Sequence, residues 1–250
     1  MMEIIKAIAL EIKKAKYGVA FTGAGISAES GIPTYRGEGG LWTKYNPNLY
    51  AHIGYFRQDP SYYWNFFKDV RYPMLKEVKP NRAHIALVEI ETFGYLKTVI
   101  TQNIDGLHQE AGSSSVIELH GTTRIITCMD CPKEYLMDEV FVMLEKQIPP
   151  LCSKCNGILR PAVVFFGEML DPKTINDAYE EAGKSDFLLV VGSSLVVHPA
   201  ADIPLRAKRA GAKLVIINKG STPLDSAADY VINDAAGNVL PQIVQSLKEA

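Results

Sequence analysis

Short runs that are apolar on both faces recur along this 250-residue chain and constrain its fold more than any other feature. Strands buried on both faces lack the polar–apolar alternation of half-exposed strands, and parallel sheets covered by helices are built from them. Stretches with helical patterning separate the runs. Strand and helix in alternation predict an α/β fold with a doubly wound, parallel, Rossmann-like sheet. The expected strands span 19–21, 96–101, 116–119, 187–191, 214–217 and 230–232, and the expected helices 81–93, 172–184, 199–210 and 238–249.

Two segments interrupt this alternation and predict the domain organisation. Residues 36–80 are rich in aromatic residues and prolines, which indicates a helical excursion from the core. Residues 122–160 carry all four cysteines of the chain and read as a small inserted zinc-ribbon module. We therefore expect residues 1–35, 81–121 and 161–250 to form one Rossmann-like, dinucleotide-binding domain.

Composition and charge exclude several classes of function. The net charge is −2 and no lysine/arginine-rich run stands out, which argues against direct nucleic-acid binding by a broad basic face. No apolar run reaches the ~20 residues of a membrane span. The N-terminus lacks a signal-peptide pattern, and the clustered cysteines leave none for a disulfide. A cytoplasmic protein is the expectation.

A glycine-rich turn follows the first expected strand. Gly23, Gly25 and Ala28 fit the G-x-G-x-x-G/A pattern that brings backbone N–H groups against a pyrophosphate. The pattern alone suits a tight structural turn equally well. Dehydrogenases of this fold carry an acidic residue about 20 positions further on, for the ribose hydroxyls. Residues 41–48 contain no carboxylate, so dinucleotide binding is favoured and hydride transfer is disfavoured.

The cysteines form two C-x-x-C pairs separated by twenty residues, which is the spacing of a zinc ribbon. Four thiolates fill a tetrahedral shell and leave no position for water. The pattern therefore predicts one structural zinc ion that supplies folding energy to its module. The predicted ligands are Cys128, Cys131, Cys152 and Cys155.

Polar residues and a histidine follow two of the expected strands. Gln102, Asn103 and Asp105 come directly after the strand at 96–101, where a parallel sheet places its ligand crevice. A simple helix N-cap is an alternative role for this cluster. His120 follows the next strand, and imidazole titrates near neutral pH, so His120 is the candidate general base. His84, at a helix start, is expected to pack or cap.

Taken together, these segments resemble the sirtuins, the NAD-dependent protein lysine deacylases. The resemblance spans nearly the whole chain in family order and is closest to compact prokaryotic sirtuins. The matching motifs are GAGISAESGIPTYRG, TQNIDGLHQEAG, VIELHG, the two C-x-x-C pairs, RPAVVFFGE, VVGSSLVV and VIIN.

The resemblance implies that NAD is a co-substrate and that His120, Asn103 and Asp105 are catalytic. In this family the acyl oxygen attacks C1′ of the ribose and expels nicotinamide, and the histidine then acts on a ribose hydroxyl. Lysine and O-acyl-ADP-ribose are the final products. The implied NAD-binding residues are Gly23, Ala24, Gly25, Ile26, Arg36, Gln102, Asn103, Ile104, Asp105, Gly192, Ser193, Ser194, Asn218 and Ala236.

The resemblance also implies an acyl-lysine peptide substrate. The peptide is expected to add as a strand between residues 164–168 and 194–197, with loose sequence specificity. Chromatin proteins and acylated metabolic enzymes are both open as partners, and a monomer is expected. The implied substrate-binding residues are Tyr35, Phe67, Val70, Val164, Phe165 and Val196.

One departure from the family bears on the acyl group. Thr34-Tyr35 replaces the frequent Asp-Phe pair and is typical of the branch that includes desuccinylases. That branch holds an acidic acyl chain with a Tyr-x-x-Arg pair, whose positions here carry Phe67 and Val70. A buried carboxylate without a partner is costly. Deacetylation is therefore expected well ahead of desuccinylation, unless Arg71 or Lys68 substitutes.

Two other functions compete with a deacylase. An ADP-ribosyltransferase would use the same NAD site and would not need the acyl group. A non-enzymatic module would join a zinc ribbon to an NAD-sensing domain and would bind protein or nucleic acid. The set of Asn103, Asp105 and His120 argues against that module.

Overall fold

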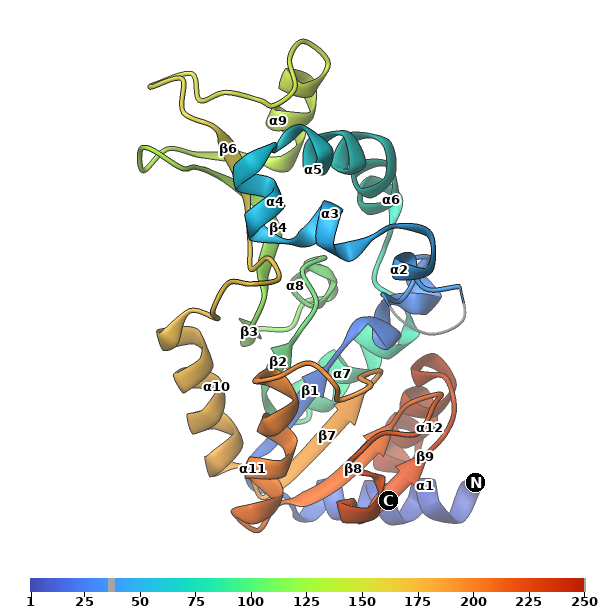
Figure 1. Cartoon of the computed structure of the whole chain (residues 1–250). Coiled ribbons are helices and arrows are strands. Elements are labelled where there is room, and N and C mark those ends of the chain that lie inside the picture. Colours follow the sequence, from blue (N-terminus) through green and yellow to red (C-terminus); the bar gives the residue numbers. More distant parts are fainter. Residues whose placement is uncertain (36–38, 250) are drawn as a thin grey trace.

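The computed structural model describes residues 1–35 and 39–249, and the larger part of them surrounds a six-stranded parallel sheet (Figure 1). The strand order is β3-β2-β1-β7-β8-β9, which confirms the predicted fold class. The chain leaves β1 on one side to form β2 and β3, and returns on the other side to form β7 to β9. Ligands bind beyond the carboxyl ends of strands at such a switch point. The strands are β1 (Gly18–Thr22), β2 (Leu96–Thr101), β3 (Val116–Glu118), β7 (Phe187–Val191), β8 (Lys213–Ile217) and β9 (Tyr230–Ile232).

Helices cover both faces of this sheet. One face packs against α1 (Met2–Lys14), α7 (Arg82–Thr92) and α12 (Ala236–Glu249). The other packs against α10 (Pro172–Lys184) and α11 (Ile203–Arg209). All five residues of β7 are buried, as its unbroken apolar run requires. A 3-10 turn, η3 (Ala200–Asp202), precedes α11, so the helix expected at 199–210 is divided near Pro204.

The two interrupting segments lie above the large sheet in Figure 1, and their buried side chains form a second core. The Trp64 indole N–H donates to the Leu159 carbonyl at 3.0 Å, which ties the helical excursion to the cysteine segment. The small antiparallel sheet has the order β5-β4-β6. Its strands are β4 (Gly121–Cys128), β5 (Glu134–Leu136) and β6 (Leu159–Val163). The helices of the two interrupting segments are α2 (Leu41–Lys44), α3 (Pro47–Ala51), α4 (Ile53–Gln58), α5 (Ser61–Phe66), the π-turn η2 (Phe67–Arg71), α6 (Tyr72–Glu77) and α9 (Met137–Leu144).

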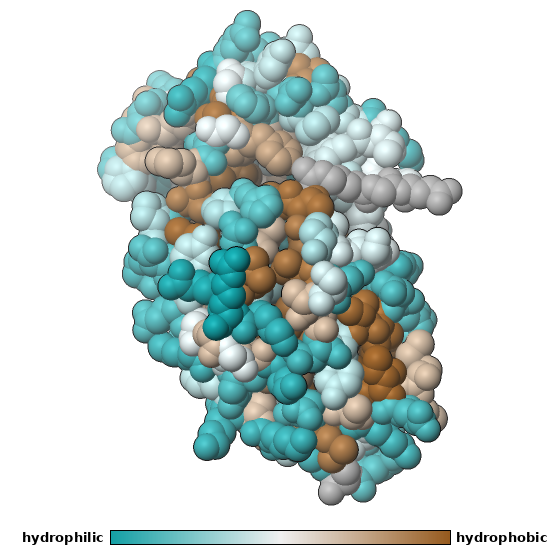
Figure 2. Space-filling model, turned by 60° about the horizontal axis from the view of Figure 1, so that its bottom comes forward, coloured by the Kyte–Doolittle hydropathy of each residue, from teal (hydrophilic) through white to brown (hydrophobic). Residues whose placement is uncertain are grey.

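At β6, the boundary between the two lobes differs from the one expected from the sequence. The sequence predicts residues 161–163 in the Rossmann-like domain, but Pro161 and Val163 pair with β4 in the small sheet. The chain leaves the cysteine turns along a strand antiparallel to the one by which it entered, so both strands belong to the small lobe. Over the described residues, no helix has the length and apolar character needed to cross a membrane. The face seen in Figure 2 is largely hydrophilic, with scattered apolar patches.

Candidate active site and zinc site

The glycine turn and the loop after β7 touch backbone to backbone at the carboxyl end of the sheet. The Gly25 N–H donates to the Gly192 carbonyl at 2.8 Å, and the Gly23 N–H donates to that of Val191 at 3.1 Å. A Cβ on Gly25 would lie 2.7 Å from Gly192 Cα, and a Cβ on Gly192 would lie 2.3 Å from the Ile26 nitrogen. Gly192 also has φ +63°. Both positions therefore require glycine.

The polar cluster after β2 lies directly beside this turn. Asn103 is buried and donates from Nδ2 to Ser27 Oγ at 3.0 Å. The Ser27 hydroxyl donates to Asp105 Oδ2 at 2.8 Å, and the Leu107 N–H donates to Asp105 Oδ1 at 3.0 Å. Burial raises the pKa of the Asp105 carboxyl, and these two hydrogen bonds act in the opposite direction. Ser27, from the 3-10 turn η1 (Ala24–Ser30), thus joins the two motifs.

His120 is oriented by the same segment. Its Nδ1 lies 2.9 Å from the Gln102 carbonyl oxygen. A carbonyl only accepts, so Nδ1 carries the proton and Nε2 is left with a free lone pair. Burial lowers the pKa of His120, with the carbonyl contact raising it in part, so the ring is neutral at pH 7. The Gln102 side chain donates to Ser193 Oγ at 2.8 Å and so connects the base to the loop after β7.

A cavity opens beside the cluster and contains several of the predicted residues. Arg71 also lines it, from the end of η2, and its Nη2 donates to the Tyr35 hydroxyl at 3.2 Å. Arg36 lies outside the described residues. The predicted residues in the lining are Ala24, Tyr35, Asn103, Ile104 and Asp105.

The remaining NAD-binding candidates lie along the same edge of the sheet. Asn218 directly follows β8; its backbone N–H donates to the Ile232 carbonyl and its Nδ2 donates to the Gly220 carbonyl at 2.7 Å. Ala236 is buried at the first position of α12. In the same first turn, the Gly237 N–H donates to Glu29 Oε2 at 2.7 Å, so the start of α12 is held against η1. Ser194 is exposed in the loop after β7.

Three substrate candidates lie in the two segments expected to hold the peptide, whereas Phe67 lies in the core of the small lobe. Val196 is 47% exposed, Val164 is half-buried, and Phe165 is buried against Phe56 at a ring-centroid distance of 5.0 Å. Phe67 is fully buried in the small-lobe core and packs against Trp64, so its side chain does not line the cavity.

The two basic residues that could replace the missing acyl-binding pair point in different directions. Lys68 Nζ donates to the Leu144 carbonyl at 3.3 Å, toward the cysteine lobe. Arg71 lies over the rings of Tyr35 and Phe66, and its buried Nε has no hydrogen-bond partner among the described residues. Val70, on the same turn, is half-buried. Of the two, only Arg71 therefore reaches the cavity.

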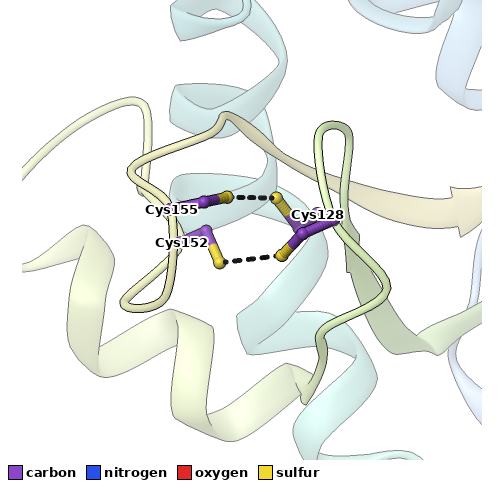
Figure 3. Close-up of side chains that lie close together, drawn as sticks. Cys128, Cys152 and Cys155 are labelled. Carbon is purple, nitrogen blue, oxygen red and sulfur yellow. Dashed lines mark hydrogen bonds between the residues drawn. The ribbon is translucent and has the colours of Figure 1, made fainter.

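The four cysteines converge in the small lobe (Figure 3). The sulfur atoms of Cys128 and Cys155 are 3.4 Å apart, those of Cys131 and Cys152 are 3.6 Å apart, and all four lie within 4.8 Å of one another. A tetrahedron with Zn–S bonds of ~2.3 Å has S···S edges of about 3.8 Å. The Tyr135 hydroxyl donates to Cys152 Sγ at 3.2 Å. The donor set and its spacing therefore fit one zinc ion.

The fold and the site together define a Rossmann-like dinucleotide-binding protein with a cysteine-bearing second lobe. The model of the Sir2 family matches residues 23–199. An NAD-dependent protein deacetylase from Saccharolobus solfataricus is 48% identical over 247 residues, which cover 98% of both chains. NAD-dependent protein deacylase 2 from Archaeoglobus fulgidus is 47% identical over 249 residues, covering 99% of this chain and 98% of that protein.

Solved structures agree with these relatives. A structure described as the basis for the mechanism and regulation of Sir2 enzymes has a TM-score of 0.92 and 47% identity, and covers 100% of this chain and 99% of its own. A Sir2–p53 peptide–NAD+ complex has a TM-score of 0.91 and 39% identity, and covers 98% of this chain and 99% of its own. The chain belongs to the Sir2 family, as its motifs predicted.

Proposed function

We propose that the chain is an NAD-dependent protein lysine deacetylase with His120 as its general base. The observation that carries the proposal is the fixed tautomer of His120. The Gln102 carbonyl holds the proton on Nδ1, so Nε2 of the neutral ring is available as a base. His120 follows β3, which pairs with β2, and Asn103 and Asp105 follow β2. Relatives named as NAD-dependent protein deacetylases and deacylases support the same reaction class.

NAD binding is assigned to the carboxyl edge of the large sheet. The glycine turn brings the start of η1 to this edge, and Ser193 and Ser194 offer hydroxyls for the pyrophosphate and a ribose. Asn218 and Ala236 flank the adenosine end, and Asn103 with Asp105 flank the nicotinamide ribose. The close approach of Gly25 to Gly192 supports this assignment, because it leaves backbone rather than side chains at the surface of the turn.

The proposed chemistry uses these groups in sequence. The acyl oxygen of the substrate attacks C1′ of the nicotinamide ribose, and the C1′–nicotinamide bond breaks. His120 Nε2 then accepts a proton from a ribose hydroxyl, and water completes the release of lysine and O-acyl-ADP-ribose. Burial lowers the pKa of His120 and keeps the ring unprotonated at neutral pH, as a base requires.

The substrate peptide is proposed to add between residues 164–168 and 194–197, with its acyl-lysine directed toward the cavity lined by Tyr35. Acetyl is preferred to succinyl, because Phe67 is fully buried and Lys68 contacts Leu144. Arg71 does reach the cavity, where its guanidinium is already engaged by the Tyr35 hydroxyl. Arg71 Nε has no partner among the described residues, so the acetyl and succinyl peptides compared below test whether this guanidinium accepts a carboxylate.

The four-cysteine cluster is proposed to bind one structural zinc ion, which fills its coordination with thiolates and takes no part in the reaction. We further propose a cytoplasmic monomer that acts on acylated proteins, with chromatin proteins as one candidate class. The use of all four thiols in one metal site supports a reducing compartment.

The test is nicotinamide release from NAD in the presence of an acetyl-lysine, a succinyl-lysine or an unmodified peptide of one sequence. The proposal expects turnover with the acetyl peptide, at least about tenfold lower kcat/KM with the succinyl peptide, and none with the unmodified peptide. Release without an acyl group, with ADP-ribose attached to the protein or peptide, would establish an ADP-ribosyltransferase instead.

A further inference from the structure

Two buried histidines lie together beside the active site and have no role in the chemistry proposed above. His84 is on α7 and His108 is on α8 (Leu107–Ala111), and their side chains are 0% and 1% exposed. Their ring centroids are 5.0 Å apart, with the planes inclined at 64°. Burial lowers the pKa of His84 to about 4 and that of His108 to about 3, so both rings are neutral at pH 7.

The hydrogen bonds of His84 fix its tautomer. The backbone N–H of Asn81 donates to His84 Nδ1 at 3.3 Å. A backbone N–H can only donate, so Nδ1 is unprotonated and the neutral ring carries its proton on Nε2. That Nε2–H is buried and has no partner among the described residues.

The tautomer of His108 is also fixed by its hydrogen bonds. The Thr22 hydroxyl donates to Thr101 Oγ1 at 2.8 Å, so its contact of 2.9 Å with His108 Nε2 is one in which the ring N–H donates. The proton of His108 is therefore on Nε2. Its bare Nδ1 is buried and, like His84 Nε2, has no partner among the described residues.

The two unpartnered atoms are complementary, because one is a donor and the other an acceptor on adjacent rings. A series of hydrogen bonds runs from His108 to the active site. Thr101 Oγ1, which accepts from Thr22, also accepts the backbone N–H of Asn103 at 3.0 Å. The side chain of Asn103 in turn donates to Ser27. A displacement at His108 would thus be transmitted to the cluster that contains Asp105.

We propose that His108 is a positioning residue for the reaction, held in its Nε2–H form by the contact of Nε2 with the Thr22 hydroxyl. It acts through Thr22 and Thr101, which set the backbone of Asn103, and it does not touch substrate. The expected effect on turnover rests on the proposed function. The predicted tautomers of the two rings do not depend on that function.

The kinetic test compares His108→Phe with His108→Gln. Phenylalanine fills the space of the ring and removes the N–H donor to Thr22, whereas the glutamine amide can restore that donor. The expected result for His108→Phe is a fall in kcat of about tenfold or more, because small misplacements of catalytic groups are costly. The KM for NAD is expected to change less than about threefold, and His108→Gln to recover most of the lost kcat. Wild-type kcat in His108→Phe, or equal impairment in both variants, would overturn the proposal.

The second test reads the tautomers directly in the wild-type chain by 15N NMR of labelled histidine. The chain has five histidines, so the ring signals are few. Both His84 and His108 are expected as neutral Nε2–H tautomers that do not titrate between pH 8 and pH 5. An Nδ1–H signal from either ring would refute the inference. This measurement stands even if a variant fails to fold. An inactive wild-type chain with the expected tautomers would instead count against the proposed function.

Discussion

Replacing Gly25 with alanine tests whether the close contact between Gly25 and Gly192 is needed for NAD binding by the proposed phosphate-binding turn. The new Cβ would lie 2.7 Å from Gly192 Cα and 2.8 Å from its carbonyl oxygen, whereas carbon atoms in contact are normally 3.5–4.0 Å apart. One backbone must therefore move by roughly 0.8 Å, which stretches the 2.8 Å hydrogen bond between the two glycines.

The cost of Gly25→Ala follows from these contacts. Overpacking costs about 1–3 kcal/mol and the weakened hydrogen bond about 1 kcal/mol more. We expect the free energy of unfolding to fall by about 2–4 kcal/mol, and the KM for NAD to rise by about tenfold or more as the turn is displaced. Denaturant unfolding and steady-state kinetics measure the two effects.

Gly183→Ala is the matched control, since a Cβ at this position in α10 would have no atom within 4 Å. It should leave the KM for NAD unchanged and stabilise the helix by about 0.5–1 kcal/mol. If Gly25→Ala bound NAD and unfolded like the wild type, the argument from backbone contact would be refuted.

Three further outcomes are expected. His120→Ala should abolish turnover and leave NAD binding by calorimetry largely intact; retained activity would remove His120 as the base. Zinc chelation should lower the unfolding temperature without competing with NAD, because the cysteines lie in the small lobe; competition with NAD would contradict a purely structural metal. His84 and His108 have folded pKa values of about 4 and 3, so below their unfolded pKa of about 6.5 the unfolded chain binds more protons. Stability should thus fall by about 2 kcal/mol per ring between pH 6.5 and pH 5, and pH-independent stability across that range would exclude neutral buried rings.

The sequence was sufficient to predict the large sheet, because unbroken apolar strands have few alternatives to burial in a parallel sheet. It was also sufficient to predict the convergence of the cysteines, since the spacing of the two pairs is itself the signal. Both features depend on patterns that are local in the chain.

Contacts between distant segments could not be predicted in this way. Ser27 and Asp105 are 78 positions apart, and no local pattern links a serine in a turn to that carboxylate. The exposure of Arg71 to the cavity, with Phe67 turned inward, depends on how η2 packs against the cysteine lobe. For the same reason, no local pattern predicts that the two interrupting segments share one core.

The most direct test of the proposed activity is mass spectrometry of the products formed from NAD and an acetyl-lysine peptide. The account predicts nicotinamide, deacetylated peptide and O-acetyl-ADP-ribose in equal amounts, and loss of all three in His120→Ala. Free acetate without O-acetyl-ADP-ribose, or nicotinamide formed in the absence of the acetyl group, would contradict it.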